Sequence, residues 1–393
     1  MSNSEINVTD IMIAMVNARS VLTDNKEFVK SIAINEMIIE KKLDFLAITE
    51  TWLSRKGDSA KIIELTPQNY SFVHSPRLES RGGGVGFVFN SCYTVKVLPQ
   101  IECITSFDLL RVRVCSVSTR TFYVYVLYRP PVGSKYAVSD SIFYDDLDLL
   151  LSEATMCVAP VILMGDFNIH YNKLDKSCKI RSLCDIYAMV QHVHDPTHTH
   201  GNTLDLVISS VEDNLISSLT VYDVALSDHY MVEMHLNIEK YKEKPKYAFK
   251  RCLRNIDIET FKSNVAAISD RIIIDPDISA CTESLNMSLQ TLINEHAPQK
   301  RICIKTRPHP WYNNDIHQAK LCRRTCERAW GRQKCVTTRN NFVSARNYVT
   351  ELITHRKTYY HDKLVNGTIL SKRIAMKFTT AHINDITTSI SPI

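Results

Sequence analysis

The chain has 393 residues, of which 45% are hydrophobic and 23% are charged, and its formal net charge is +5. This composition is typical of a folded globular protein and excludes a fibrous or largely disordered chain. The polar N-terminus and the lack of an apolar run of about 18 residues predict neither a secretory signal nor a membrane span. The 12 cysteines are scattered along the chain, which indicates reduced thiols and an intracellular protein.

Short apolar segments alternate with turn signals through residues 1–240. Their length and their β-branched or aromatic side chains predict strands, at residues 11–16, 43–49, 84–89, 109–117, 121–128, 161–167 and 204–209. Apolar residues at helical spacing predict helices at Lys26–Lys41 and Phe143–Glu153. We therefore expect a mixed α/β domain, which we assign to residues 1–237.

The character of the chain changes after Val232. Residues 241–251 are charged and interrupted by proline, which is typical of an exposed boundary, so residues 238–308 are predicted to be a linker with short helices. Residues 309–393 are predicted to be a basic helical connector, with one long helical pattern from Asn314 to Leu364.

The charges are divided unevenly between the two halves. Of the 47 Lys and Arg residues 26 lie from position 241 onward, but only 13 of the 42 Asp and Glu residues do. A basic tail behind an acidic body favours a polyanionic partner such as nucleic acid. The alternative is that the tail packs on the first domain and its charges are merely solvated.

Polar groups that can bind a metal follow several of the predicted strands, where open α/β sheets build their sites. They include Asn17 after residues 11–16 and Glu50 after residues 43–49. A carboxylate held at the end of a buried strand suits a hard cation such as Mg²⁺. The alternative for Glu50 alone is a solvent-facing residue at a strand end.

The sequence Gly165-Asp166-Phe167-Asn168 places two polar side chains on the same side of an extended segment. Asp166 can take a proton from a water molecule that Asn168 orients, as in-line attack on phosphorus requires. The alternative is an Asx turn, for which both residue types are common.

A third polar group is Ser227-Asp228-His229. His229 can be charged near neutrality, and Asp228 can serve as a metal ligand or an electrostatic partner. Asp205 is a candidate to orient the imidazole. Taken singly, His229 could equally be a structural histidine and Asp205 a surface strand residue.

Together these residues carry a resemblance that none carries alone. The ordered set Asn17, Glu50, Tyr128, GDFN (165–168), Asp205 and SDH (227–229) resembles the endonuclease/exonuclease/phosphatase superfamily, which includes deoxyribonuclease I-like and abasic-site nucleases. Within it, six segments resemble the endonuclease of non-LTR (LINE-type) retrotransposons: ITETWL (48–53), RGGGVGFVF (81–89), YRPP (128–131), GDFNIH (165–170), TLDLVIS (203–209) and LSDHY (226–230).

The resemblance implies an α/β fold, a four-layer α/β/β/α sandwich with the site at one edge. It implies that Glu50, Asn17 and Asp228 hold Mg²⁺, with Mn²⁺ as an alternative ion. It also implies catalytic roles: Asp166 and Asn168 align and deprotonate the attacking water, Tyr128 contacts the phosphate, His229 stabilises developing charge, and Asp205 orients His229.

The resemblance further implies a DNA endonuclease that leaves 3′-hydroxyl and 5′-phosphate ends, with the nucleus favoured over the cytoplasm. Arg129 is a candidate for contact with a DNA phosphate, or else a structural arginine. The region from Pro308 onward is similar to what precedes the reverse transcriptase in such elements, and RNA is a further candidate partner for it. Polymerase motifs are absent from the sequence, so the chain resembles an endonuclease with a truncated connector.

Two other functions remain as alternatives. The first is a phosphodiesterase of the same fold that acts on abasic DNA or a phosphoinositide. The second is a non-catalytic element remnant that binds nucleic acid. The spacing of His192, His194, His198 and His200, and of Cys322 and Cys326, is not typical of a zinc site.

Overall fold

The computed structural model describes residues 10–22, 29–54, 58–77, 82–115, 121–239, 247–269, 277–303 and 309–366. Its contacts divide the chain into two units: Met1–Tyr241 with Pro310–Ile393, and Lys242–His309. The predicted boundary near residue 240, the start of the helix predicted at Lys26 and the tail beyond residue 366 lie outside the described residues.

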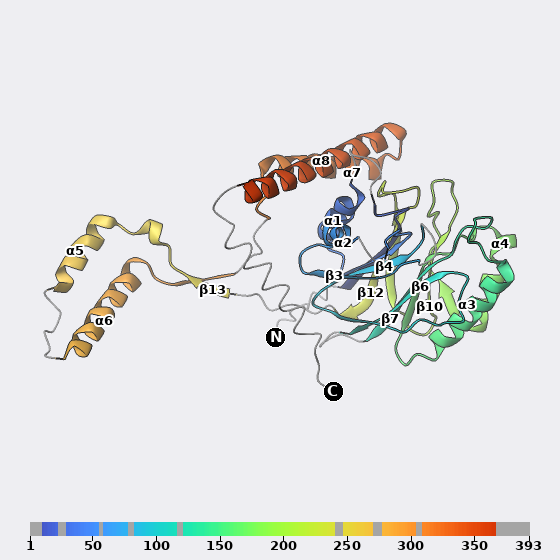
Figure 1. The fold of residues 1–393 in the computed structure, drawn as a ribbon, viewed down its shortest axis with the longest axis horizontal. Coiled ribbons are helices and arrows are strands. Elements are labelled where there is room, and N and C mark those ends of the chain that lie inside the picture. Colours follow the sequence, from blue (N-terminus) through green and yellow to red (C-terminus); the bar gives the residue numbers. More distant parts are fainter. Residues whose placement is uncertain are drawn as a thin grey trace, which may run out of the picture. The chain divides into compact units, whose positions relative to one another are not determined.

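The first unit contains two six-stranded sheets (Figure 1). The first sheet has the order β11-β12-β1-β2-β4-β3. In it β1 and β2 are parallel and the other neighbours are antiparallel. Its strands are β1 (Asp10–Asn17), β2 (Phe45–Thr49), β3 (Tyr70–Ser75), β4 (Val85–Asn90), β11 (Ile216–Tyr222) and β12 (Met231–Glu239).

The second sheet has the order β5-β6-β7-β8-β10-β9. Here β7 and β8 form the parallel pair, and the other neighbours are antiparallel. Its strands are β5 (Thr94–Val97), β6 (Asp108–Cys115), β7 (Phe122–Tyr128), β8 (Val161–Asp166), β9 (Met189–Gln191) and β10 (Asp205–Ser210).

Alternating side chains of the strands divide between two apolar layers. In β1, Ile11, Ile13 and Met15 join the core between the sheets, whereas Ala14 and Val16 face the helical layer. This follows from the two-residue period of a strand, and both faces are apolar because both are covered. Residues 11–16 (IMIAMV) therefore form an unbroken apolar run.

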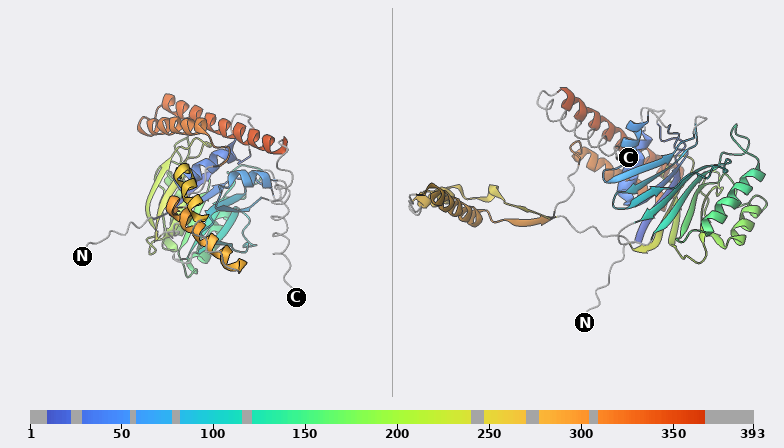
Figure 2. Two further views of the ribbon diagram at one scale, coloured as in Figure 1. Left: turned by 90° about the vertical axis from the view of Figure 1, so that its left-hand side faces the viewer. Right: turned by 60° about the horizontal axis from the view of Figure 1, so that its bottom comes forward.

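Helices cover the outer face of each sheet (Figures 1 and 2). On the first sheet lie α1 (Lys30–Lys41) and α2 (Ser59–Leu65), and on the second lie α3 (Asp140–Thr155) and α4 (Leu174–Ile186). From α3, Phe143, Leu147 and Leu150 are fully buried against the second sheet. The predicted four-layer α/β/β/α sandwich is confirmed.

The C-terminal part of the first unit is a helical hairpin, α7 (Asn314–Arg332) and α8 (Val336–Asn366). The prediction of one long helix from Asn314 is wrong, because the chain leaves the helix at Gln333 in an extended conformation. The hairpin lies next to α1 (Figure 1). An apolar cluster joins them, which contains Ile32, Ile316, Ala319, Val349 and Ile353.

The second unit is small and is described by itself. Its two-stranded antiparallel sheet pairs β13 (Tyr247–Lys250) with β14 (Lys300–Cys303). Between these strands come the short 3₁₀ helix η1 (Leu253–Asn255), α5 (Ile258–Ser269) and α6 (Ile278–His296). Arg251 donates to the carbonyl oxygen of Ala297 at 2.7 Å, which ties the sheet to the end of α6. Among the described helices of the whole chain, none is long and apolar enough to cross a membrane.

Candidate active site

Strand pairing brings five of the predicted site residues to one edge of the sandwich. In the first sheet Asn17 ends β1, beside Thr49 of the parallel strand β2, and Glu50 follows Thr49. In the second sheet Asp166 ends β8, with Tyr128 of β7 on one side and Asp205 of β10 on the other.

Asn17 connects the two sheets. Its amide nitrogen donates to Glu50 Oε1 at 3.0 Å and to Asp166 Oδ2 at 2.8 Å, and the residue is fully buried. Its amide oxygen accepts from the Arg19 main-chain nitrogen at 2.9 Å. In this orientation the amide nitrogen of Asn17 faces both carboxylates and positions them. The amide oxygen would face a metal bound between the carboxylates only if the amide group rotated by half a turn.

Glu50 leaves its strand in a left-handed conformation, with a φ of 52°. Such a conformation is costly for a residue with a side chain and is retained where the surroundings determine it. Here Glu50 Oε2 accepts from the indole nitrogen of Trp52 at 3.1 Å, and the Glu50 carbonyl accepts from Ser20. The half-buried carboxylate is therefore held in the cluster and is not a solvent-facing strand end.

At the turn Gly165–Asn168 the main chain lies very close to β7. Gly165 has a φ of 150°, and a Cβ atom there would lie 1.8 Å from the carbonyl oxygen of Leu127. Asp166 Oδ1 accepts from the main chain of Asn168 at 2.9 Å, and Asn168 Nδ2 donates to Asp166 Oδ2 at 3.1 Å. The turn predicted as an alternative is present, and it holds Asp166 within the cluster.

Asp205 and His229 form a buried pair. Asp205 Oδ2 lies 2.8 Å from His229 Nδ1, and the two side chains are 3% and 6% exposed. Burial lowers the pKa of His229, but the Asp205 carboxylate and its hydrogen bond outweigh burial and raise that pKa to about 9. The imidazole is thus held in its charged form at neutral pH.

Asp166 lies beside this pair in the adjoining strand. Burial, followed by the charge of Asp205, raises the pKa of Asp166 above its ordinary value, although His229 opposes the shift. A carboxylate with a raised pKa is a stronger base than a solvated one.

Asp228 is held by Arg19 and His198. Its Oδ2 accepts from Arg19 Nη1 at 2.5 Å and lies 3.2 Å from His198 Nε2. Burial raises the pKa of Asp228, but Arg19 and His229 together hold it below its usual value. Among the described residues, its buried Oδ1 finds no hydrogen-bond partner.

Tyr128 is the last residue of β7, and Arg129 follows it. Their side chains have different surroundings. Burial, then the charges of Glu50 and Asp166, raise the pKa of Tyr128 far above its ordinary value, so its hydroxyl stays neutral. The side chain of Arg129, 5% exposed, pairs with Asp140 at 2.5 Å and lies over the ring of Phe143. Its guanidinium thus binds Asp140, the first residue of α3. Among the described residues it does not take part in the cluster of site carboxylates.

Sequence reasoning missed four residues of this region: Arg19, Trp52, Arg77 and His198. Arg77 lies 5.4 Å from the ring of Tyr128 and binds both oxygens of Asp108. Nothing in the sequence links Arg77 to a partner 31 residues away. For Arg19, closeness to Asn17 was the available signal.

The donor groups of the site fit a hard divalent cation. Ligand atoms of Asp166, Asp205 and His229 lie within 4.8 Å of one another, as do those of His198, Asp228 and His229. A protonated His229 offers no free nitrogen to a metal, so the carboxylate oxygens are the candidate ligand atoms of these groups, with His198 beside Asp228. The carboxylate oxygens of the site suit Mg²⁺, and the unpartnered Oδ1 of Asp228 is a further oxygen donor.

A pocket of about 690 Å³ adjoins the site at His198. The loop at residues 195–201 forms one wall, and the end of α7 forms another with Trp330 and Lys334. Tyr222 and Tyr230 also line it. Pockets of this size with mixed polar and aromatic walls accommodate small organic groups.

Comparison with known proteins identifies one family. The sequence profile described as "Endonuclease/Exonuclease/phosphatase family" matches residues 17–229, more than half of the chain, from the first to the last residue of the site. No curated protein matches the sequence.

Several solved structures are similar to part of this chain. An AP endonuclease from Leishmania major has 15% sequence identity and a TM-score of 0.45, covering 62% of this chain and 91% of its own. A 3′ phosphatase from Neisseria bound to a product DNA hairpin has 14% identity and a TM-score of 0.45, covering 58% of this chain and 99% of its own. A protein from Leptotrichia buccalis has 15% identity and a TM-score of 0.43, covering 58% and 99%.

Proposed function

Because the chain belongs to the endonuclease/exonuclease/phosphatase family of hydrolases, we propose that it is a Mg²⁺-dependent DNA endonuclease. The observation that carries the proposal is the continuous network from Glu50 through Asn17 to Asp166, next to the Asp205–His229 pair. The network joins a metal-binding group, a base and a charged donor at one edge of the sandwich.

In the proposed mechanism the water is activated by Asp166. Its raised pKa favours acceptance of a proton near neutral pH. Asn168 fixes the carboxylate through hydrogen bonds to both of its oxygens. The attack forms a bond between the water oxygen and phosphorus and breaks the bond between phosphorus and the 3′ oxygen. The leaving 3′ oxygen takes up a proton from solvent water, which gives 3′-hydroxyl and 5′-phosphate ends.

His229 and Tyr128 are proposed to act on the phosphate itself. The charged imidazole donates a hydrogen bond to a phosphate oxygen as negative charge grows there. Asp205 keeps that imidazole charged and in one orientation. The hydroxyl of Tyr128, which its raised pKa keeps protonated, donates to the same phosphate.

Glu50 and Asp228 are proposed to hold the cation, with Asn17 setting the position of Glu50. When bound, the ion supplies charge neutralisation on the phosphate, as Lewis acids do in this chemistry. Mn²⁺ offers similar ligand preferences and is expected to substitute.

DNA is the proposed substrate, and the six segments that resemble retrotransposon endonucleases support this choice. Arg129 was a candidate for phosphate contact, but such contact would require its pair with Asp140 to open. Arg19, whose side chain is 57% exposed beside Asp228, is better placed to meet a phosphate. Aromatic groups of the adjoining pocket offer surfaces for the neighbouring nucleotide.

The test is cleavage of supercoiled plasmid by the full chain with Mg²⁺ and with chelator. We expect nicked circles with Mg²⁺, and none with chelator. A labelled duplex, the same duplex with an abasic site, and a phosphoinositide separate the proposed substrate from its alternatives. Absence of cleavage of every substrate in Mg²⁺ or Mn²⁺ would show a binding module instead.

A further inference from the structure

The loop Asp223–Leu226 carries the chain from β11 into Ser227-Asp228-His229. Ala225 is in the left-handed region, with a φ of 54°, and its nitrogen donates to Asp223 Oδ1 at 2.6 Å. Val224 and Leu226 are buried in the apolar layer over the first sheet. The loop therefore has a determined conformation, and its last residues lead directly into the site.

The far end of this loop is fixed to β1. Ser227 Oγ donates to the carbonyl oxygen of Asn17 at 2.6 Å and accepts from the main chain of His229 at 3.1 Å. Residues 223–226 are thus joined to Asp228 and His229 by one short segment that is hydrogen-bonded to β1.

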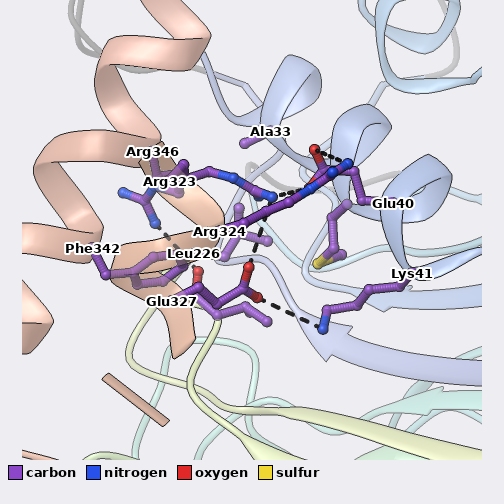
Figure 3. Close-up of a pocket in the computed structure, with 11 residues that line it drawn as sticks. Ala33, Glu40, Lys41, Leu226, Arg323, Arg324, Glu327, Phe342 and Arg346 are labelled. Carbon is purple, nitrogen blue, oxygen red and sulfur yellow. Dashed lines mark hydrogen bonds and ion pairs between the residues drawn. The ribbon is translucent and has the colours of Figure 1, made fainter. Parts of the chain in front are cut away.

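Two arginines of α8 hold the near end of the loop. Arg346 Nη1 donates to the carbonyl oxygen of Ala225, and lies 3.4 Å from that of Val224. Arg339 Nε donates to Asp223 Oδ2 at 2.8 Å. In Figure 3, Arg346 and Phe342 extend from α8 toward Leu226. These contacts join residues far apart in sequence: 116 positions separate Arg339 from Asp223, and 121 separate Arg346 from Ala225.

Arg346 is an unusual residue to bury. Burial lowers its pKa to about 10, although Asp223 opposes the shift. A guanidinium in this position constrains both the distance and the direction of the groups that accept from it, because its N–H donors form a rigid planar fork. Replacing it leaves the part-buried carbonyl group of Ala225 without that donor.

The hairpin is anchored independently of the loop. Lys320 and Arg323 of α7 form ion pairs with Glu36 and Glu40 of α1. Glu327 lies 3.9 Å from Lys41, and Figure 3 shows this pair beside the Arg323–Glu40 contact. The apolar cluster of Ile32 with Ile316 and Ile353 adds a hydrophobic contact to these ion pairs. The loop is consequently held by a scaffold with its own attachment to the sandwich.

We infer that the hairpin α7/α8 belongs to the catalytic unit, and that Arg346 and Arg339 are positioning residues that set Asp228 and His229 in the site. This inference rests on the proposed function. It differs from the expectation drawn from the charge split, that the basic tail serves a polyanionic partner such as nucleic acid. A displacement of about 1 Å in a catalytic group can cost on the order of 10²-fold in rate.

The experiment compares full-chain variants. For Arg346→Ala we expect kcat to fall by about 10-fold to 10²-fold with a smaller change in KM, and Arg346→Lys to recover part of the loss. Arg356→Ala is the matched control: it removes an arginine from the same helix, whose partner Asp315 lies within the hairpin. We expect its kcat to equal that of the wild type.

A second pair of substitutions keeps the inference testable if Arg346→Ala does not fold. Arg339, with a side chain 36% exposed, is replaced by aspartate, and by lysine as the conservative variant. We expect Arg339→Asp to lose activity and Arg339→Lys, which keeps a cationic donor for Asp223, to retain part of it. Wild-type activity in both Arg339→Asp and Arg346→Ala would overturn the inference.

The imidazole resonances of His229 in metal-free protein give a readout that does not need activity. We expect them to shift in Arg346→Ala and Arg339→Asp, and to stay unchanged in Arg356→Ala. A wild-type protein that cleaves nothing would refute the proposed function, while the resonances would still decide the positioning role. Unchanged resonances together with unchanged cleavage would refute the positioning role alone.

Discussion

At the scale of single residues, hydrogen bonds convert ordinary polar side chains into a site. Asn17 donates one hydrogen bond to Glu50 and one to Asp166, so that two carboxylates of different sheets share one donor. Asp205 determines the charge of His229. Each of these effects depends on a neighbour within 3.0 Å, which is why variants of individual residues are informative.

Substitution of the proposed base or of the proposed donor should abolish cleavage. Asp166→Asn and His229→Ala are each expected to lower kcat by about 10² to 10⁴, because each removes a proton-transfer or charge-stabilising group. Asp145→Asn, an exposed change on α3, serves as the control. Plasmid nicking measures the effect, and near wild-type nicking by either variant would remove that residue from the mechanism.

The charge state of His229 should depend on Asp205. Burial alone lowers the pKa of His229, and Asp205 raises it to about 9. In metal-free protein we therefore expect the Asp205→Asn variant to lose the imidazole proton at a lower pH than the wild type. An NMR titration of the His229 resonances follows this directly. Equal midpoints in the two proteins would mean that another group sets the pKa.

At the scale of elements, the strands that the sequence did not reveal are mostly edge strands. The unpredicted strands β3, β5, β9 and β11 are the four edges of the two sheets. An edge strand has one neighbour and more exposed side chains, so its apolar pattern is weaker. In β5, TVKV is largely exposed, whereas the interior strand β2 is buried throughout. One interior strand, β12, was also missed.

The close approach of β7 and β8 at Gly165 should make this glycine indispensable. A Cβ would lie 1.8 Å from the Leu127 carbonyl oxygen, so Gly165→Ala must move a central strand. We expect a loss of unfolding free energy of about 3 kcal/mol, the upper range of overpacking effects. Urea unfolding measures it.

Gly133→Ala is the matched control for this prediction. Gly133 also has a positive φ, of 86°, but a Cβ there meets nothing within 4 Å. Gly133→Ala should lower the free energy of unfolding by only about 1 kcal/mol, because glycine adopts a positive φ more readily than alanine does. Equal losses in the two variants would mean that backbone conformation, and not the contact with Leu127, accounts for the cost.

At the scale of the whole molecule, much of the tail's positive charge is paired with the sandwich. Lys320 binds Glu36, and Arg323 binds Glu40. Arg339 binds Asp223. All three acidic partners lie in the first 241 residues. Arg328, Arg332 and Lys334 at the end of α7 are exposed. The basic region thus divides into charges that dock the hairpin and charges that face solvent.

The solvent-facing charges should account for the hairpin's share of the salt dependence of DNA binding. Each phosphate contact contributes about 0.9 to the slope of log affinity against log salt. We expect the triple variant Arg328→Ala, Arg332→Ala, Lys334→Ala to bind a labelled duplex with a smaller slope, and Arg356→Ala to bind as the wild type does. Identical slopes for triple variant and wild type would show that these charges are only solvated.

The sequence by itself determined the class of fold, and it predicted several residues that the structure brings together at one edge of the sandwich. Interior strands are recognisable because burial on both faces requires continuous apolar runs. Site residues such as Glu50 and Asp166 directly follow or end those runs, so local sequence identifies them. Their roles in catalysis stay predictions.

Only the tertiary structure decided how these groups are oriented and what supports them. The burial of Arg129 against Asp140, the orientation of the Asn17 amide and the proximity of His198 to Asp228 depend on contacts between distant segments. The docking of α8 on the loop before His229 spans more than 100 residues, as separations of 116 and 121 show. Local patterns of hydrophobicity and charge carry no information about which distant partner a side chain meets, because that choice is made by the packing of whole elements.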